Sequence, residues 1–186
     1  MKRLLDLLLS LLVLLLFLPI FLICCLAVKL TSKGPIFYIS DRIGENNEHF
    51  NMLKFRSMRT DAPQVATHLL QDPTSLLTPI GGFLRKSSLD ELPQLINVIK
   101  GEMSIVGPRP ALFNQDDQIE LRTASGAHVL VPGITGWAQI NGRDDISIER
   151  KVELDTWYLA NRSFGLDLKI IFLTAWQIIF SNNVSH

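Results

Sequence analysis

The apolar segment from Leu7 to Val28 constrains the fold of this chain most strongly, because only Ser10 interrupts its hydrophobic character. About 20 consecutive apolar residues are enough to cross the hydrocarbon core of a bilayer. The segment exceeds the roughly 7–15 apolar residues of a signal peptide, and no small-x-small cleavage site follows it. We therefore expect a helix that enters the membrane and is retained in the protein.

Two membrane arrangements fit this segment: one transmembrane helix, or a re-entrant helix that bends at Pro19 and leaves on the side it entered. Proline removes a backbone hydrogen bond and kinks a helix, although spanning helices also tolerate it. Basic residues flank both ends, with Lys2 and Arg3 before the segment and Lys29 and Lys33 after it. The positive-inside tendency places both groups on the cytoplasmic side and favours the re-entrant hairpin. The residues alone leave both arrangements open.

The remaining residues, 34–186, are expected to form one domain, since no repeat or hinge divides them. Apolar residues at strand and helix spacing predict an α+β fold that is mainly helical. The expected strands are 36–39 and 50–58; the expected turns are 41–44, 131–137 and 141–143; the expected helices are 83–86, 91–99, 114–124, 147–160 and 165–180. A loop is expected at 60–79. The last helix suits a membrane interface or a buried core equally well.

Composition excludes several classes of protein. The chain has 18 basic and 18 acidic residues, so no charge excess indicates nucleic-acid binding. The two cysteines, Cys24 and Cys25, are neighbours in the apolar segment and offer neither a disulfide framework nor zinc spacing. A Walker loop, a GxGxxG motif and a GxSxG motif are all missing from the sequence.

Asp90 and Glu91 are the strongest candidates for chemistry. They precede Pro93, which is tolerated only in the first turn of a helix, so both carboxylates are expected at a helix N-terminus. The unpaired N–H groups and the dipole of a helix stabilise negative charge there. A structural alternative is a capping box between Ser88 and Glu91, and caps are commoner than active sites. Both interpretations stay open.

Basic residues that can complement these carboxylates occur upstream and downstream of them. A cationic cluster beside a carboxylate pair can bind a metal–diphosphate, because guanidinium groups bind phosphate oxygens bidentately. Magnesium commonly takes one or two carboxylates plus substrate phosphates. Solvation or contact with anionic lipid is the alternative, above all for Lys86 and Arg59. Asp144 and Asp145 lack the DxD pattern and are expected to begin a helix. The basic candidates are Lys54, Arg56, Arg59, Arg85, Lys86 and Arg109, with Arg109 between two prolines.

The sequence resembles the monotopic phosphoglycosyl transferases, also called bacterial sugar transferases, in a small form with the catalytic unit alone. The signatures that carry the resemblance run in family order: Lys54-Phe55-Arg56-Ser57-Met58, Ser88-Leu89-Asp90-Glu91-Leu92-Pro93-Gln94-Leu95, Lys100-Gly101-Glu102-Met103-Ser104, Val106-Gly107-Pro108-Arg109-Pro110, Pro132-Gly133-Ile134-Thr135-Gly136 and Gln139-Ile140-Asn141-Gly142-Arg143.

The resemblance implies a re-entrant membrane helix over residues 1–33 and a catalytic domain over 34–186. Interfacial amphipathic helices and small strand elements would then place the active site on the cytoplasmic face of the bacterial inner membrane. Leu18 stands where family members often have a serine before the proline.

The resemblance also implies a reaction: transfer of a sugar 1-phosphate from a UDP-sugar to undecaprenyl phosphate, with release of UMP, as the first membrane step of bacterial glycan assembly. The implied mechanism is ping-pong, with Asp90 as nucleophile, a covalent aspartyl phosphosugar intermediate and Glu91 as its partner. Both carboxylates would lie at a Mg²⁺ ion. The residues implied to hold phosphate are Arg109, then Arg143 and Arg85, and more weakly Lys54.

The C-terminal pattern Glu153-Leu154-Asp155-Thr156-Trp157-Tyr158 is similar to small members that start amino-sugar glycans, which favours an N-acetylated amino-sugar donor. A glucose or galactose donor, and a homodimer, stay open. Two other functions compete: a membrane-anchored scaffold without turnover, and a metal-dependent diphosphate hydrolase with no lipid acceptor.

Overall fold

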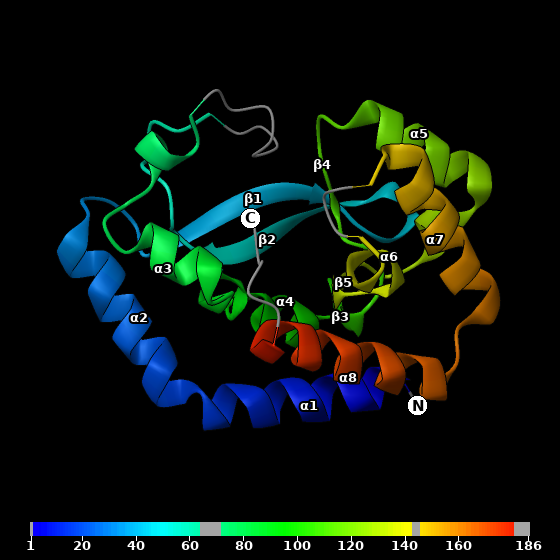
Figure 1. Cartoon of the computed structure of the whole chain (residues 1–186), viewed down its shortest axis with the longest axis horizontal. Helices are drawn as coiled ribbons and strands as arrows, with labels where there is room; N and C mark the ends of the chain where they lie inside the picture. Colours follow the sequence, from blue (N-terminus) through cyan, green and yellow to red (C-terminus); the bar gives the residue numbers. More distant parts are fainter. Residues whose placement is uncertain (1, 64–71, 143–145, 181–186) are drawn as a thin grey trace.

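The N-terminal apolar segment forms two helices joined by a sharp bend. The computed structural model describes residues 2–63, 72–142 and 146–180. Helix α1 (Lys2–Leu16) and helix α2 (Leu18–Thr31) meet at an angle of 66°, and Figure 1 shows them as an L along one edge of the protein. Within the described residues, no single helix is long and apolar enough to cross a membrane, but this bent pair meets the length and composition requirement together.

The bend lies where the sequence predicts it. Pro19 lies in the first turn of α2, where backbone N–H groups have no partner within the helix, so its missing N–H removes no hydrogen bond from α2. Phe17 between the helices has φ −93° and ψ 6°, outside helical values, although its N–H still bonds Val13 O at 2.9 Å. The helix therefore changes direction at a proline rather than continuing as one straight rod.

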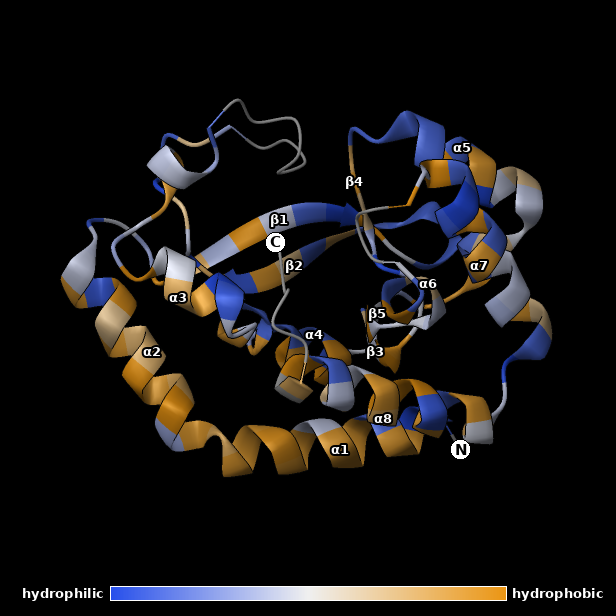
Figure 2. Ribbon diagram, viewed as in Figure 1, coloured by the Kyte–Doolittle hydropathy of each residue, from blue (hydrophilic) through white to orange (hydrophobic). Residues whose placement is uncertain are grey.

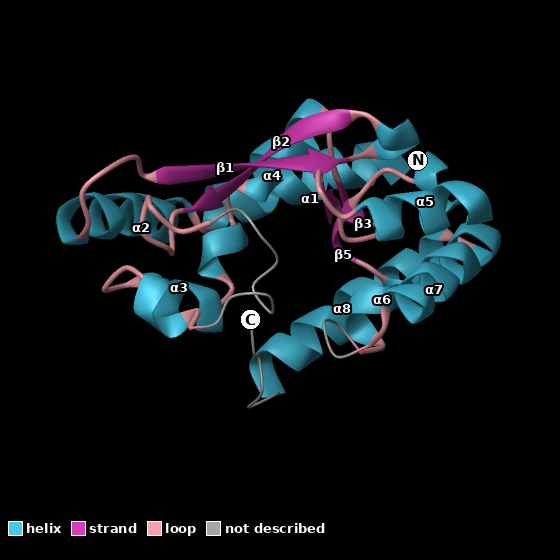
Figure 3. Cartoon of the chain, turned by 90° about the horizontal axis from the view of Figure 1, so that it is seen from above, coloured by secondary structure: helices cyan, strands magenta, loops and turns pink. Residues whose placement is uncertain are grey.

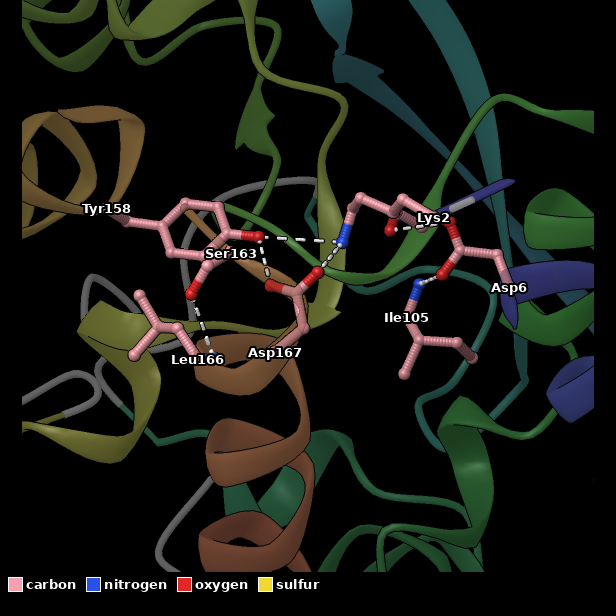
Figure 4. A network of polar contacts seen from close by, with 8 residues as sticks. Lys2, Asp6, Ile105, Tyr158, Ser163, Leu166 and Asp167 are labelled. Atoms are coloured by element: carbon pink, nitrogen blue, oxygen red, sulfur yellow. Dashed lines mark hydrogen bonds and ion pairs between the residues drawn. The ribbon is translucent and has the colours of Figure 1, made fainter. Parts of the chain in front are cut away.

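Polar side chains in the first two turns of α1 attach it to the rest of the protein (Figure 4). The ammonium group of Lys2 donates to Asp167 at 2.8 Å, and the Tyr158 hydroxyl donates to the same carboxylate at 2.6 Å. The buried carboxylate of Asp6 accepts the Ile105 N–H at 3.0 Å. These charged residues are bound within the protein, while leucines from Leu4 onward leave the outer face of α1 apolar.

Two small sheets form the centre of the domain. Strand β1 (Phe37–Ile43) pairs antiparallel with β2 (His49–Phe55) and with the short β4 (Ala111–Leu112), while β3 (Ser104–Val106) pairs parallel with β5 (Gly133–Thr135). The expected turn at 41–44 is wrong over 41–43, which belong to β1. The hairpin turns instead at a 3-10 segment, Glu45–Asn47, where Asn46 and Asn47 have positive φ. The strand expected at 50–58 ends at Phe55.

The helices follow the prediction with two differences. Observed are α3 (Gly81–Lys86), α4 (Gln94–Lys100), α5 (Asp116–Ser125), α6 (Trp137–Ile140), α7 (Ile148–Asn161) and α8 (Phe164–Phe180). The helix expected at 91–99 is divided: Leu89–Glu91 form a 3-10 turn and α4 begins after Pro93. The turn expected at 131–137 is wrong over 133–135, which form β5, and helix α6, which begins at Trp137, was not predicted. The mainly helical α+β class is confirmed.

Seen from above in Figure 3, the β3 and β5 strands lie between α1 and α8, and both helices contact β3. The larger core cluster joins α4, β3 and α8, and it contains the fully buried Val98 and Ile170. A smaller cluster holds α2 against β2 and α3 through Val28 and Phe55. Along α8, Ile170 is buried while Phe172 and Trp176 are exposed, so this helix has both a core face and an apolar outer face. Figure 2 shows the apolar character of α1, α2 and α8.

Candidate active site

The Asp90–Glu91 pair lies in the 3-10 turn between α3 and α4. Ser88 precedes the turn with a left-handed backbone (φ 55°), and its side chain makes no capping hydrogen bond, so the capping-box alternative is not the observed arrangement. The Glu91 N–H bonds the backbone carbonyl of Ser88 at 3.2 Å. Asp90 and Glu91 therefore do not serve as helix caps, and both line one cavity together with several cationic side chains.

Two cations from distant parts of the chain contact Glu91. The ammonium group of Lys54 on β2 lies 2.8 Å from Glu91 Oε1, and the guanidinium group of Arg109 lies 3.2 Å from the same oxygen. The side chains of Lys54 and Glu91 are about 85% buried, with exposed fractions of 15% and 14%. A largely desolvated ion pair of this kind holds its members in fixed positions more than it stabilises the fold. The Lys54–Glu91 and Arg109–Glu91 contacts bring three of the predicted site residues together.

Asp90 is the more buried carboxylate, with 6% of its surface exposed. Burial raises its pKa from 3.8 to about 6, against the opposing effects of Lys54, Arg85 and Arg109, and with a smaller increase from Glu91. We expected a helix N-terminus to keep this carboxylate readily ionised. In the structure, desolvation raises its pKa by more than the neighbouring positive charges lower it. Its Oδ1 atom is buried without a hydrogen-bond partner. At pH 7 the group is still mostly ionised, as a poorly solvated carboxylate.

Arg42 is a cation of this site that the sequence did not indicate. It lies on β1, in the segment expected to be a turn, and lines the cavity that contains Asp90. Its guanidinium group donates to Ser40 Oγ at 2.9 Å and to the Pro110 carbonyl at 3.2 Å. Burial, and then the neighbouring charge of Arg109, lower its pKa to about 10, so it remains protonated at pH 7. Its place at the site follows from the pairing of β1 with β2, in which Arg42 lies opposite Phe50, and no local pattern of the sequence indicates that pairing.

The cavity has a volume of about 850 Å³ and three chemically different walls. The first wall carries charge, from Arg42, Lys54, Arg85, Asp90, Glu91 and Arg109. The second carries amide and basic side chains from α5 and the residue before it, from α6 and from α7, namely Gln115, Gln118, Arg122, Gln139 and Lys151. The third is apolar and comes mainly from α1 and α8: Leu9, Val13, Phe17, Ile171, Ala175 and Ile178. The space thus joins a mainly cationic surface to a hydrocarbon-like one.

Several other predicted basic residues lie elsewhere. Arg56 is buried and donates to the Pro35 carbonyl at 2.7 Å and to Ser32 at 2.8 Å, which ties the end of α2 to β2. Arg59 pairs with Asp61 on the surface at 2.6 Å. Of the predicted phosphate-binding residues, Lys54, Arg85 and Arg109 line the cavity. Arg143, and the pair at 144–145, lie outside the described residues.

The donor set for a metal consists of two carboxylates. Within residues 2–63, 72–142 and 146–180, no group of three or more acidic, histidine or cysteine side chains could hold a metal ion by itself. Asp90 nevertheless offers a buried oxygen without a partner, and Glu91 is adjacent to it. One or two carboxylates completed by substrate phosphates is the usual protein environment of Mg²⁺, so the residues fit a cation that binds together with a diphosphate.

Comparison with known proteins agrees with the signatures. The profile of the family described as bacterial sugar transferase matches residues 1–181. The uncharacterized sugar transferase EpsL of Bacillus subtilis (strain 168) is 45% identical over 186 residues, covering 99% of this chain and 90% of that protein.

Two further relatives have longer chains. The UDP-glucose:undecaprenyl-phosphate glucose-1-phosphate transferase of Escherichia coli (strain K12) is 42% identical, covering 95% of this chain and 40% of that protein. The UDP-N-acetylgalactosamine-undecaprenyl-phosphate N-acetylgalactosaminephosphotransferase of Aeromonas hydrophila is 38% identical, covering 96% and 43%. This chain therefore spans less than half of each. The family resemblance is confirmed: the chain belongs to the bacterial sugar transferase family.

Proposed function

We propose that this protein transfers a sugar 1-phosphate from a UDP-sugar to undecaprenyl phosphate and releases UMP. The observation that carries the proposal is the buried Asp90 carboxylate, which shares one cavity with the four cationic side chains of the charged wall and with an apolar wall. The charged wall suits a diphosphate, and the apolar wall suits a lipid acceptor. The relatives from Escherichia coli and Aeromonas hydrophila are named for this reaction with different sugars.

The first half-reaction forms a covalent intermediate on Asp90. A carboxylate oxygen attacks the β-phosphorus, the bond from phosphorus to the bridging oxygen breaks, and that oxygen leaves on UMP with the electron pair. A carboxylate is a weak nucleophile, but desolvation and a raised pKa make this one more reactive than an exposed aspartate. Lys54, Arg85 and Arg109 are placed around Asp90 so that they can stabilise the negative charge on the transferred group.

The second half-reaction releases Asp90. A phosphate oxygen of undecaprenyl phosphate attacks the same phosphorus, the bond to Asp90 breaks, and the aspartate leaves as the carboxylate. Glu91, held by Lys54 and Arg109, keeps these cations at the site throughout the cycle. Asp90 and Glu91 would also hold Mg²⁺, which when bound would neutralise charge on the diphosphate and the departing UMP.

The bent α1–α2 pair is proposed to be a re-entrant membrane anchor at the cytoplasmic face of the inner membrane. Its outer face is apolar, with Leu11, Leu15 and Leu26 more than half exposed. The polar beginning of α1 is bound to the domain, and Lys29 follows at the other end, so both ends fit the same side of the bilayer. An N-acetylated amino sugar is the proposed donor group, since the C-terminal pattern favours it.

One assay separates transfer from its alternatives. The purified protein in lipid nanodiscs is incubated with Mg²⁺, undecaprenyl phosphate and a panel of labelled UDP-sugars. A lipid-linked diphosphosugar together with UMP is the expected result. UMP without lipid product would indicate a hydrolase, and no turnover with any donor would indicate a scaffold.

Intact-mass analysis tests the intermediate separately. Protein mixed with its donor in the absence of acceptor should gain the mass of one sugar phosphate, and Asp90→Asn should not gain it. Product formation without such an adduct, or normal turnover by Asp90→Asn, would overturn the assignment of Asp90.

A further inference from the structure

Gln139 has an unusual environment for an amide side chain. Both its Oε1 and its Nε2 atoms are buried, and neither has a hydrogen-bond partner. Leaving a buried donor and a buried acceptor unpaired is costly, and native proteins rarely do so without a reason. Because both ends of the amide are unpaired, this conclusion does not depend on which end is assigned as oxygen. Gln139 also lines the cavity that contains Asp90, which makes a bound ligand the natural partner.

The backbone fixes the position of Gln139 relative to Arg109. Strand β5 leads into α6, which carries Gln139, and the parallel strand β3 leads into the segment that carries Arg109. The two segments meet backbone to backbone, since the Gly107 N–H bonds the Thr135 carbonyl and the Gly133 N–H bonds the Pro108 carbonyl, both at 2.8 Å.

Glycines make this close approach possible. A Cβ atom on Gly136 would lie 2.0 Å from the Gly107 carbonyl oxygen and 2.6 Å from Gln139 Oε1. The backbone of Gln139 and that of the Arg109 segment are therefore held in fixed relation by direct contact, and both residues line the cavity. A ligand that reaches both would carry a phosphate and an uncharged polar group, as a nucleotide does.

The chemistry of a primary carboxamide narrows the choice of that uncharged group. Its carbonyl oxygen and its N–H lie side by side, so it forms two parallel hydrogen bonds with a ligand that presents an N–H next to a C=O on the same edge. The imide edge of uracil, with N3–H beside O4 or O2, has this arrangement. The trans acetamido group of an N-acetylated sugar does not, because its N–H and C=O point in opposite directions.

We propose that Gln139 binds the imide edge of the uracil ring of the donor nucleotide. This inference rests on the proposed function, because it assumes a uridine-containing donor. In the same wall, Arg122 is engaged by Asp155 through two hydrogen bonds, at 2.7 and 3.0 Å, so it supports the cavity. Gln139 is the side chain of that wall whose two polar ends are both buried and unpaired.

The test is direct binding of UMP, measured by calorimetry on the full-length protein in nanodiscs, so that turnover is not needed. Gln139→Leu should bind UMP about 10- to 100-fold more weakly than wild type, because two buried hydrogen bonds are lost. Gln139→Glu has the same shape but lacks the donor, and it should also bind more weakly. Gln94→Leu is the matched control, since Gln94 is a buried amide with an unpartnered Nε2 that does not line the cavity. It should bind UMP like wild type.

A change in the ligand provides a second arm that needs no folded variant. UMP methylated at N3 lacks the N3–H, so wild type should bind it at least tenfold more weakly than UMP, while Gln139→Leu should bind the two ligands alike. Equal binding of both ligands by wild type would overturn the proposal. So would a Gln139→Leu protein that binds UMP normally but UDP-sugar weakly, because the amide would then contact the sugar. Those outcomes leave the transfer reaction intact, whereas absence of transfer with every UDP-sugar would refute the proposed function itself.

Discussion

Asp90→Asn should make the protein more stable at neutral and alkaline pH while abolishing turnover. Burial raises the pKa of Asp90 from 3.8 to about 6, so the native state keeps this proton at pH values where the unfolded chain has lost it. Stability from this group is therefore complete below about pH 4 and falls as pH rises towards 6. At 1.36 kcal/mol per pKa unit, the ionised form costs the native state about 3 kcal/mol at pH 8.

Asparagine removes that charge but adds amide hydrogens that need partners, so the expected net gain is about 2 kcal/mol at pH 8. For a chain of this size the melting temperature should rise by roughly 4–8 °C. The assay is thermal unfolding in nanodiscs at pH 4.5 and pH 8, with the difference between variant and wild type much smaller at pH 4.5. Asp155→Asn is the control. Burial raises the pKa of Asp155 too, but its carboxylate accepts two hydrogen bonds from the buried Arg122, so its replacement leaves that guanidinium poorly paired and should destabilise the protein at both pH values. A destabilised Asp90→Asn protein at pH 8 would refute the reasoning.

Three further predictions follow from the contacts. Lys54 lowers the pKa of Asp90, so Lys54→Met should move the acid limb of the pH profile of kcat/KM from about pH 6 to higher pH. Lys54→Arg retains the positive charge and should leave the limb near pH 6. An unmoved limb in Lys54→Met would contradict the effect of the Lys54 charge on Asp90. Asp6→Ala leaves the Ile105 N–H and the Ser104 hydroxyl without their acceptor and should lower the free energy of unfolding by about 2–4 kcal/mol, measured by chemical denaturation. Asp6→Asn keeps one acceptor oxygen and should lose less stability than Asp6→Ala. Gly136→Ala should lower kcat/KM at least tenfold, because the added Cβ atom would push the end of β5 away from the Gly107 carbonyl. A Cβ atom on Gly165 meets nothing within 4 Å, so Gly165→Ala should retain activity. Equal activities of the two variants would argue against the importance of the Gly136–Gly107 contact.

Local features of the sequence predicted much of the fold. The bend at Pro19, the termination of α4 at Gly101 and the extents of α7 and α8 follow from residues within one or two turns of each position. Prolines and glycines restrict the backbone where they stand, and apolar spacing reveals a helix without knowledge of its partner. The hairpin turn was misplaced because Asp41 and Gly44 resemble turn residues, whereas the cross-strand hydrogen bonds continue β1 to Ile43.

The candidate site was predicted only in part. Asp90, Glu91, Lys54 and Arg109 belong to recognisable motifs, Arg85 lies shortly before one of them, and the structure brings all five to one cavity. Arg42 and Gln139 were not predicted as site residues, although Gln139 begins one of the signatures. Their relevance depends on how β1 pairs with β2 and how β5 pairs with β3, which no local pattern of the sequence encodes.

The sequence by itself determined which residues carry charge beside a helix-starting proline, where the N-terminal apolar segment bends, and which family the chain belongs to, because each of these depends on residue type and short spacing. The tertiary structure decided how strongly Asp90 is desolvated, which cations surround it, and that Asp6 of the first helix holds a strand 99 residues away. Desolvation and ion pairing depend on distances between groups that are remote along the chain. Only the folded chain sets those distances.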